Sequence, residues 1–520
     1  MKRLRAGAPA AAPLIVLLAI YILVRSAHFD YVPLWDGRFT HSEMQAVLAR
    51  QGLNPFAYAL FNHSSILLLW LFACIERFFA GDVLAFNLAI LCLGLACVLG
   101  FHALLRATTP LNDVERALAT ALLAFHPTIL STLVQFSTDL GVLALLPLYV
   151  WSVLTRRYRV SAALGLAMVF CKESAVILLP AAWLLRARPD WKWVRDTALG
   201  LALPLAGFFL YYLLKSRLPG PEGAGQAGLW SGLTLTGLIT TFLNPLSGGK
   251  VALAYWAEMF ALSFSWALGL GILFACRRKR FIPAFLSLLY LAYALTRFQT
   301  FTNLRYVSYA AVFLVLVYAM GVARMASARA RLAALAVPLV LLATSCWHSW
   351  DPVSRAIFGT FEFGTHRMFR MTSVTGECCG LYGRDQLIYN LQFLALQDVQ
   401  NEAYELIRPT AQTIILTSAQ ANFSARMHLL AGPLDRRSFH RSLGGPNSFT
   451  PAYTLARELR MRQAAHRPLP PEVYYLQFPL FDDHEEIAAT RSLYQQVQSR
   501  KVSSHGYEIR LYRFSVPRAD

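Results

Sequence analysis

The chain has 520 residues, of which 56% are hydrophobic and only 15% are charged. Soluble domains typically carry about 25% charged residues, so this composition excludes a wholly soluble protein. The formal net charge is +19, but Lys and Arg stand mostly in short clusters between apolar runs. Such clusters are typical of membrane topology signals, and we exclude nucleic-acid binding as their purpose.

Apolar runs recur from Leu14 to Trp347 and predict a membrane domain over residues 1–347. Because basic loops stay in the cytoplasm, each pair of basic clusters must enclose an even number of crossings. The clusters are Lys2–Arg5, Arg106 with Arg116, Arg156–Arg159, Arg186–Arg195, Arg277–Arg280 and Arg324–Arg331. About eleven transmembrane helices satisfy this rule, with the N-terminus inside and the C-terminus outside. They cover 9–27, 83–105, 117–135, 140–154, 160–172, 174–186, 197–215, 252–275, 281–296, 304–322 and 331–347.

For two segments, the parity rule and not hydropathy determines whether the chain is predicted to cross the membrane. Residues 64–80 are apolar but must not cross, and the embedded Glu76 and Arg77 favour a helix lying at the outer surface. Residues 160–186 must turn at Cys171–Ser174 and form two short half-spans, which are tolerated only where they line protein or water. The alternative makes 64–80 a span and 160–186 one helix. It preserves the final parity but moves two basic clusters outward.

The tail from 348 to 520 has ordinary mixed composition and predicts a small soluble α/β domain on the outer side. It contains no nucleotide-binding fingerprint. The adjacent Cys378 and Cys379 could pair elsewhere or with each other, although an adjacent disulfide is strained. The expected elements are a helix over Asp385–Leu406, strands over Thr413–Thr417 and Val473–Phe478, a helix over Asp483–Gln498 and a strand over Tyr507–Phe514.

Candidate acids face the outer compartment. Asp36 lies in the first outer loop, residues 28–82, where a carboxylate can act as general base toward an incoming hydroxyl. The alternative is that Asp36 and Gly37 merely form a turn. Asp139 follows an outward helix and faces the same compartment, and its alternative role is to N-cap the helix from Leu140.

Candidate cations face the same side. Lys172 and Glu173 stand at the turn between the half-spans, where ionisable groups are costly and usually functional; the alternative is an internal ion pair. Adjacent helical residues do not face one another, so Lys172 is expected to be available for an anion. Arg297 and Arg305, with Tyr306, flank a late outer loop where arginines could clamp a lipid phosphate or simply extend to lipid headgroups. His63 could be a ligand or an interfacial residue. No metal cluster is evident, and we expect no metal and no cofactor.

The order of these residues resembles the GT-C superfamily of membrane glycosyltransferases, particularly protein O-mannosyltransferases and bacterial lipid A aminoarabinose transferases, over roughly residues 10–325. Trp35–Glu43 resembles the family's first-loop acidic motif, with Gly37 in place of the second acid. Asn62–Ser65 falls at the family's His-Pro-Pro, and Gln135–Asp139 at its Arg-then-Asp motif, without the prolines and that Arg. Phe170–Ser174 resembles the Lys-Glu-Thr turn, and Leu304–Tyr306 resembles the late Arg-Tyr motif.

The resemblance implies a polytopic α-helical enzyme of the bacterial inner membrane with a periplasmic α/β domain. It implies inverting transfer of a sugar from a polyprenyl-phosphate donor to an unidentified acceptor. Asp36 would deprotonate the acceptor, while Lys172 and Arg305 stabilise the phosphate leaving group. Two alternatives remain at this point: a lipid or solute transporter, and a non-catalytic lipid-binding scaffold of the envelope.

Overall fold

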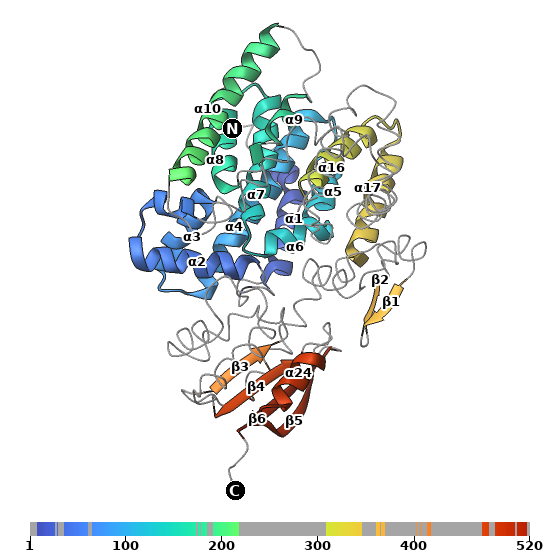
Figure 1. Ribbon diagram of the computed structural model, residues 1–520. Coiled ribbons are helices and arrows are strands. Elements are labelled where there is room, and N and C mark those ends of the chain that lie inside the picture. The colour runs from blue at the N-terminus through green and yellow to red at the C-terminus, as the bar shows by residue number, and fades with distance from the viewer. Residues whose placement is uncertain are drawn as a thin grey trace, which may run out of the picture. The chain divides into compact units, whose positions relative to one another are not determined.

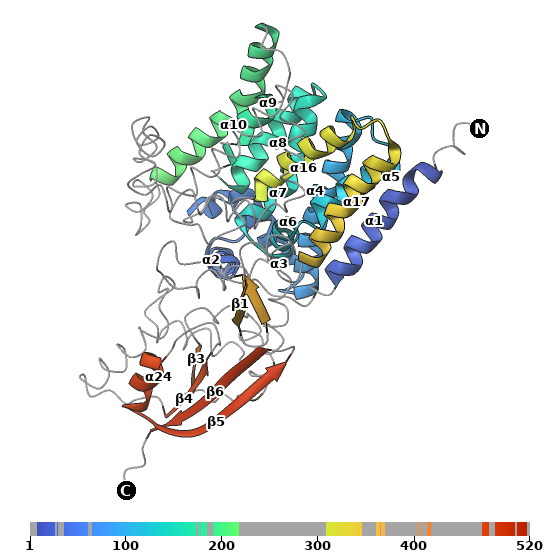
Figure 2. The same cartoon turned by 90° about the vertical axis from the view of Figure 1, so that its right-hand side faces the viewer.

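The computed structural model describes residues 8–26, 29, 36–60, 65–172, 175–176, 178–184, 191–217, 308–345, 360–363, 366–369, 402, 406, 413–417, 471–477, 484–504 and 507–516. The chain divides into two compact units, a helical unit and a C-terminal unit with a β-sheet. Figures 1 and 2 show the elements of each.

The first helices are α1 (Ala8–Ser26), α2 (Asp36–Gln51), the short 3₁₀ helix η1 (Pro55–Leu60) and α3 (Ile66–Phe78), and α2 belongs to the helical unit from Thr40 onward. α3 has 13 residues and is therefore about 20 Å long, shorter than the roughly 30 Å hydrocarbon core of a bilayer. This length agrees with the prediction that residues 64–80 do not cross.

The central helices are α4 (Val83–Thr108), α5 (Asp113–Ala124), α6 (Pro127–Val134), α7 (Thr138–Leu154) and α8 (Tyr158–Cys171). The prediction of one helix over 117–135 is wrong, because the chain breaks between α5 and α6. Pro127 cannot donate a backbone hydrogen bond and its ring would clash with the preceding turn, so it starts a new helix. α5 also begins earlier than expected, at a capping box formed by Asn112 and Glu115.

The remaining helices among the described residues of this unit are α9 (Leu178–Leu184), α10 (Trp191–Arg217), α16 (Ser308–Val322) and α17 (Ala328–Ser345). The spans expected at 252–275 and 281–296 lie outside the described residues. Two described helical stretches, Val83–Thr108 and Trp191–Tyr211, are long and apolar enough to cross a membrane by length and composition. Large apolar side chains on outward faces remain exposed, for example Leu23 at 72%, Phe209 at 67% and Val340 at 62%.

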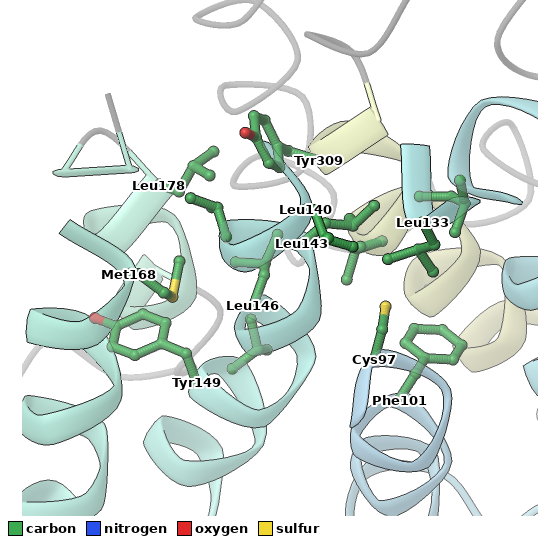
Figure 3. Packing of buried hydrophobic residues seen from close by; sticks show 14 of the residues in the cluster. Cys97, Phe101, Leu133, Leu140, Leu143, Leu146, Tyr149, Met168, Leu178 and Tyr309 are labelled. Carbon is green, nitrogen blue, oxygen red and sulfur yellow. The ribbon is translucent and has the colours of Figure 1, made fainter. Parts of the chain in front are cut away.

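α7 lies at the core of the helical unit, packed against α4 on one side and α8 on the other. Figure 3 shows Leu140, Leu143 and Leu146 of α7 among Cys97 of α4, Met168 of α8 and their neighbours. The core is apolar along most of α7, which follows from its largely hydrophobic sequence after Asp139.

The predicted turn within residues 160–186 is confirmed. α8 ends at Cys171, and Lys172 has an extended backbone with φ −162° and ψ 129°. After the turn the chain returns along α8, because the ring of Trp183 stacks on that of Tyr158 with centroids 5.7 Å apart. Trp183 also donates a hydrogen bond to the Tyr149 hydroxyl at 3.0 Å. One through-going helix is therefore wrong for this segment.

Basic loops gather at one end of the helical unit, which we name the basic end. It comprises the α4–α5, α7–α8 and α16–α17 connections and the start of α10. Glu115 of α5 binds Arg331 of α17 at 2.7 Å, which joins two of these connections. Trp193 at the start of α10 donates a hydrogen bond to the carbonyl of Trp183 at 3.1 Å. The ring of Trp183 stacks on Tyr158, the first residue of α8, so the start of α10 lies near the α7–α8 connection.

α4 and α7 run in the same direction and so end at the same side. Near their starts, the Phe86 and Phe136 rings are 5.1 Å apart. Farther along, a Cβ on Gly100 would meet the Leu148 side chain at 2.7 Å. The clusters around Arg106 and Arg156 therefore lie at the basic end, as the parity rule predicts. We name the opposite end, where α7 begins and α8 finishes, the site end.

Cysteine labelling should separate these two ends. In a background without the eight native cysteines, Arg50→Cys in α2 should react with a membrane-impermeant maleimide in intact spheroplasts. Ser327→Cys, before α17, should react only after permeabilisation, because positively charged connections remain in the cytoplasm. Labelling of both positions from the same side would contradict the topology.

The C-terminal unit holds a two-stranded and a four-stranded sheet. β1 (Thr360–Phe363) pairs antiparallel with β2 (His366–Phe369). The larger sheet has the order β3-β4-β6-β5, with β3 (Thr413–Thr417) parallel to β4 (Glu472–Gln477) and the other pairs antiparallel. α24 (His484–Arg491) contributes Ile487 to its core beside Val473 and Phe514. The strands expected over 413–417 and 507–514 are confirmed, and the one expected over 473–478 is confirmed as far as Gln477, the last described residue there.

One predicted helix in this unit is wrong in its second half. The chain is helical over His484–Arg491, but Gln495–Ser504 forms β5 rather than continuing to Gln498. β5 pairs antiparallel with β6 (Tyr507–Ser515), so sheet pairing outweighs the helix propensity of its glutamines. The helix expected over 385–406, and the cysteines at 378 and 379, lie outside the described residues except Glu402 and Leu406.

Candidate functional site

A buried ion pair joins the start of α7 to the end of α8. Lys172 Nζ lies 2.7 Å from Asp139 Oδ1, and their side chains are 6% and 0% exposed. The helix dipoles favour both charges, because Asp139 stands in the first turn of α7 and Lys172 directly follows the last turn of α8. The two ends can meet because Gly141 has no side chain. A Cβ there would lie 2.7 Å from Cys171 Sγ.

Two expectations about these residues are corrected. Asp139 does not N-cap the helix, because the N-cap of α7 is Ser137. Lys172 was expected to have no partner within the protein, but its ammonium binds Asp139. The reason is that the break after Cys171 turns Lys172 out of the helix, toward a carboxylate 33 residues earlier in the chain.

Tyr309 is a third member of this cluster and was not predicted. Its hydroxyl donates a hydrogen bond to Asp139 Oδ1 from the beginning of α16. Figure 3 shows Tyr309 above Leu140 and Leu178, at the site end. The sequence signal was close, because the predicted Tyr306 stands three residues earlier in the sequence. We refer to Asp139, Lys172 and Tyr309 as the α7–α8–α16 cluster.

A second polar cluster ties α2 to α3 and was also missed. Glu76 of α3 lies 3.3 Å from His41 Nε2 and accepts a hydrogen bond from Gln45 Nε2 at 2.8 Å. His41 and Gln45 are four residues apart and share one face of α2. Their spacing could have indicated a polar face, but the partner 31 residues beyond Gln45 could not be foreseen.

Aromatic rings connect the two clusters. The His41 ring meets Phe86 edge-on at 5.3 Å and Phe136 at 6.4 Å, and Phe72 of α3 packs against both. Phe136 stands three residues before Asp139. Both polar clusters therefore lie at the site end, opposite the basic loops.

The structure places only part of the predicted site. Asp36 is the first residue of α2, so its backbone begins a helix instead of an isolated turn, and its side chain is outside the description. Of the predicted residues, the structure brings together Asp139 and Lys172. The others, His63, Glu173, Arg297, Arg305 and Tyr306, lie outside the described residues. Within the described ranges, no three His, Cys, Asp or Glu side chains are arranged to hold a metal ion.

No family model matches the chain, and no curated protein matches it. Two solved structures are similar to it over nearly their whole length. Both are ArnT from Cupriavidus metallidurans, one bound to undecaprenyl phosphate and one in the apo state, at 13% and 12% sequence identity. Each match covers 97% of this chain and 98% of that chain with a TM-score of 0.46.

Proposed function

We propose that this protein is a membrane glycosyltransferase that moves a sugar from a polyprenyl-phosphate donor to an acceptor on the periplasmic face. The observation that carries the proposal is the α7–α8–α16 cluster. A lysine and an aspartate are buried together at a break in the helices, opposite the basic loops. Ionisable groups are expensive at such a depth and are retained mainly where they serve a function.

Lys172 is proposed to stabilise the phosphate that leaves when the donor is cleaved. An ammonium has three hydrogens, so it can serve Asp139 and a phosphate oxygen together. The buried carboxylate keeps the ammonium in position before the donor arrives, and a preorganised cation helps most where charge develops. Arg305 and Arg297 are proposed as further phosphate ligands, with His63, Glu173 and Tyr306 binding the lipid phosphate or the sugar.

Asp36 is proposed as the general base of an inverting reaction. It takes the proton from the acceptor hydroxyl while that oxygen bonds to the anomeric carbon of the sugar. The bond from this carbon to the phosphate oxygen breaks, and polyprenyl phosphate leaves with the electron pair. A lipid donor suits a compartment without nucleotide sugars. No metal is needed in this scheme.

The proposed location is the bacterial inner membrane. Residues 1–347 form the transmembrane domain with the outer loop 28–82, and residues 348–520 form a periplasmic domain. The apolar exposed faces of α1, α10 and α17 are what lipid contact requires, because a soluble surface rarely exposes so many large apolar side chains.

The test uses purified full-length protein in lipid nanodiscs with a panel of polyprenyl-phosphate sugars and envelope extract. We expect release of polyprenyl phosphate from at least one donor, and loss of release in Lys172→Ala. Binding of a donor without turnover by any acceptor would favour the scaffold. Movement of lipid across the bilayer without cleavage would favour the transporter, because broken helices also occur in transporters.

A further inference from the structure

His41 is held more rigidly than a surface histidine. On one side, Nε2 faces the carboxylate of Glu76 at 3.3 Å. The rings of Phe86 and Phe136 stand nearly perpendicular to the imidazole, with centroids 5.3 and 6.4 Å from it. The side chains of both His41 and Glu76 nevertheless keep 16% of their surface exposed. The carboxylate and the two rings therefore orient the imidazole, while part of its side chain remains exposed.

The carboxylate of Glu76 determines which nitrogen of the neutral ring carries the proton. An ionised carboxylate only accepts hydrogen bonds, so Nε2 must donate. Nδ1 then carries a lone pair and is an acceptor. No residue in the described part of the chain hydrogen-bonds to Nδ1. Because the Glu76 carboxylate orients the ring, Nδ1 is arranged to accept a hydrogen bond from a bound ligand.

We infer that His41 Nδ1 accepts a hydrogen bond from a hydroxyl of the acceptor substrate, and that Glu76 and Gln45 are positioning residues for it. This inference rests on the proposed function and names the acceptor side of that site. The negative charge of Glu76 disfavours a phosphate at this position, so the group bound is a neutral hydroxyl, from a sugar or from a serine or threonine side chain.

One substitution separates ligand binding from a structural link. The amide nitrogen of glutamine can stand where Nε2 stands, so His41→Gln keeps the donor to Glu76 but removes Nδ1. His102→Gln is the matched control, because His102 bonds to Thr120 between α4 and α5, away from the site end. Both variants should unfold at the same temperature as wild type within a few degrees.

The first measurement does not need turnover. Carbethoxylation of His41 by diethyl pyrocarbonate is followed by mass spectrometry in nanodiscs with methyl glucoside, a serine- and threonine-containing peptide, or inorganic phosphate. We expect one hydroxyl probe to slow modification and phosphate to leave it unchanged; the probe that protects identifies the source of the hydroxyl. Modification unaffected by both hydroxyl probes, or slowed equally by phosphate, would overturn the inference.

The second measurement uses the protecting probe as acceptor with a lipid-linked donor. His41→Gln should raise the acceptor KM about tenfold, the effect of losing one hydrogen bond, with kcat and the donor Kd unchanged. His102→Gln should match wild type. An unchanged KM in His41→Gln would show that His41 only links α2 to α3. Absence of donor binding in wild type would instead refute the proposed glycosyltransferase and leave the protection result standing.

Discussion

Lys172→Met is expected to lower the free energy of unfolding by about 3–5 kcal/mol and to abolish donor cleavage. The stability loss arises because the variant leaves the Asp139 carboxylate buried without its counter-ion, and breaking one half of a buried pair costs this much. Activity is lost because the leaving phosphate has no ammonium beside it. Unfolding in detergent micelles and polyprenyl-phosphate release in nanodiscs measure the two effects.

Two further variants make this prediction specific. The double variant Lys172→Met with Asp139→Leu should recover much of the stability but none of the activity, since it removes both charges. Lys192→Met is the matched control, because Lys192 is exposed near the start of α10 and should change neither quantity. An unfolding midpoint equal to wild type in Lys172→Met would mean that the ion pair contributes nothing.

The sequence predicted most of the described helices because their apolar runs are long and bounded by basic residues. It also predicted the return of the chain after Cys171, although hydropathy alone favours one helix there. The parity rule gave that prediction. The Arg clusters before and after residues 160–186 must lie at the same end of the molecule, so the chain has to turn between them. The stacking of Trp183 on Tyr158 is the packing that results.

The two wrong predictions, at the α5–α6 break and at β5, have physical reasons. Pro127 was a readable signal for the α5–α6 break, but the continuous apolar character of residues 117–135 concealed it. β5 is strand because β6 pairs with it, and no property of Gln495–Ser504 alone specifies that partner. Such elements depend on contacts that the local sequence does not contain.

The sequence predicted that Asp139 and Lys172 lie at the same end of the molecule, but it did not predict their pairing. Asp139 and Lys172 were both placed on one face by parity, yet their contact requires α7 and α8 to approach at Gly141. Tyr309 meets Asp139 across 170 residues, and Glu76 meets His41 across 35. Side chains that meet over such separations can be assigned to an end of the molecule from sequence, while their partners come from packing.

Asp36→Asn is expected to reduce sugar transfer by about 10²–10⁴-fold, the contribution typical of a general base. The amide has nearly the same shape as the carboxylate but cannot take a proton. The free energy of unfolding should change little, because asparagine and aspartate are equally good at helix starts and α2 begins at this residue. Initial rates of transfer to the acceptor, with the donor Kd measured in parallel, test this directly.

The control for Asp36→Asn is Asp82→Asn, at the end of the same outer loop. Asp82 caps α4 by accepting a hydrogen bond from the backbone of Leu84 at 2.7 Å, and asparagine can replace it there. Its transfer rate should therefore equal wild type. Loss in Asp36→Asn alone, with donor binding intact, assigns proton removal to this carboxylate. Full activity in Asp36→Asn would remove Asp36 from the mechanism and would make His41, whose Nδ1 faces no described partner, the next base to test.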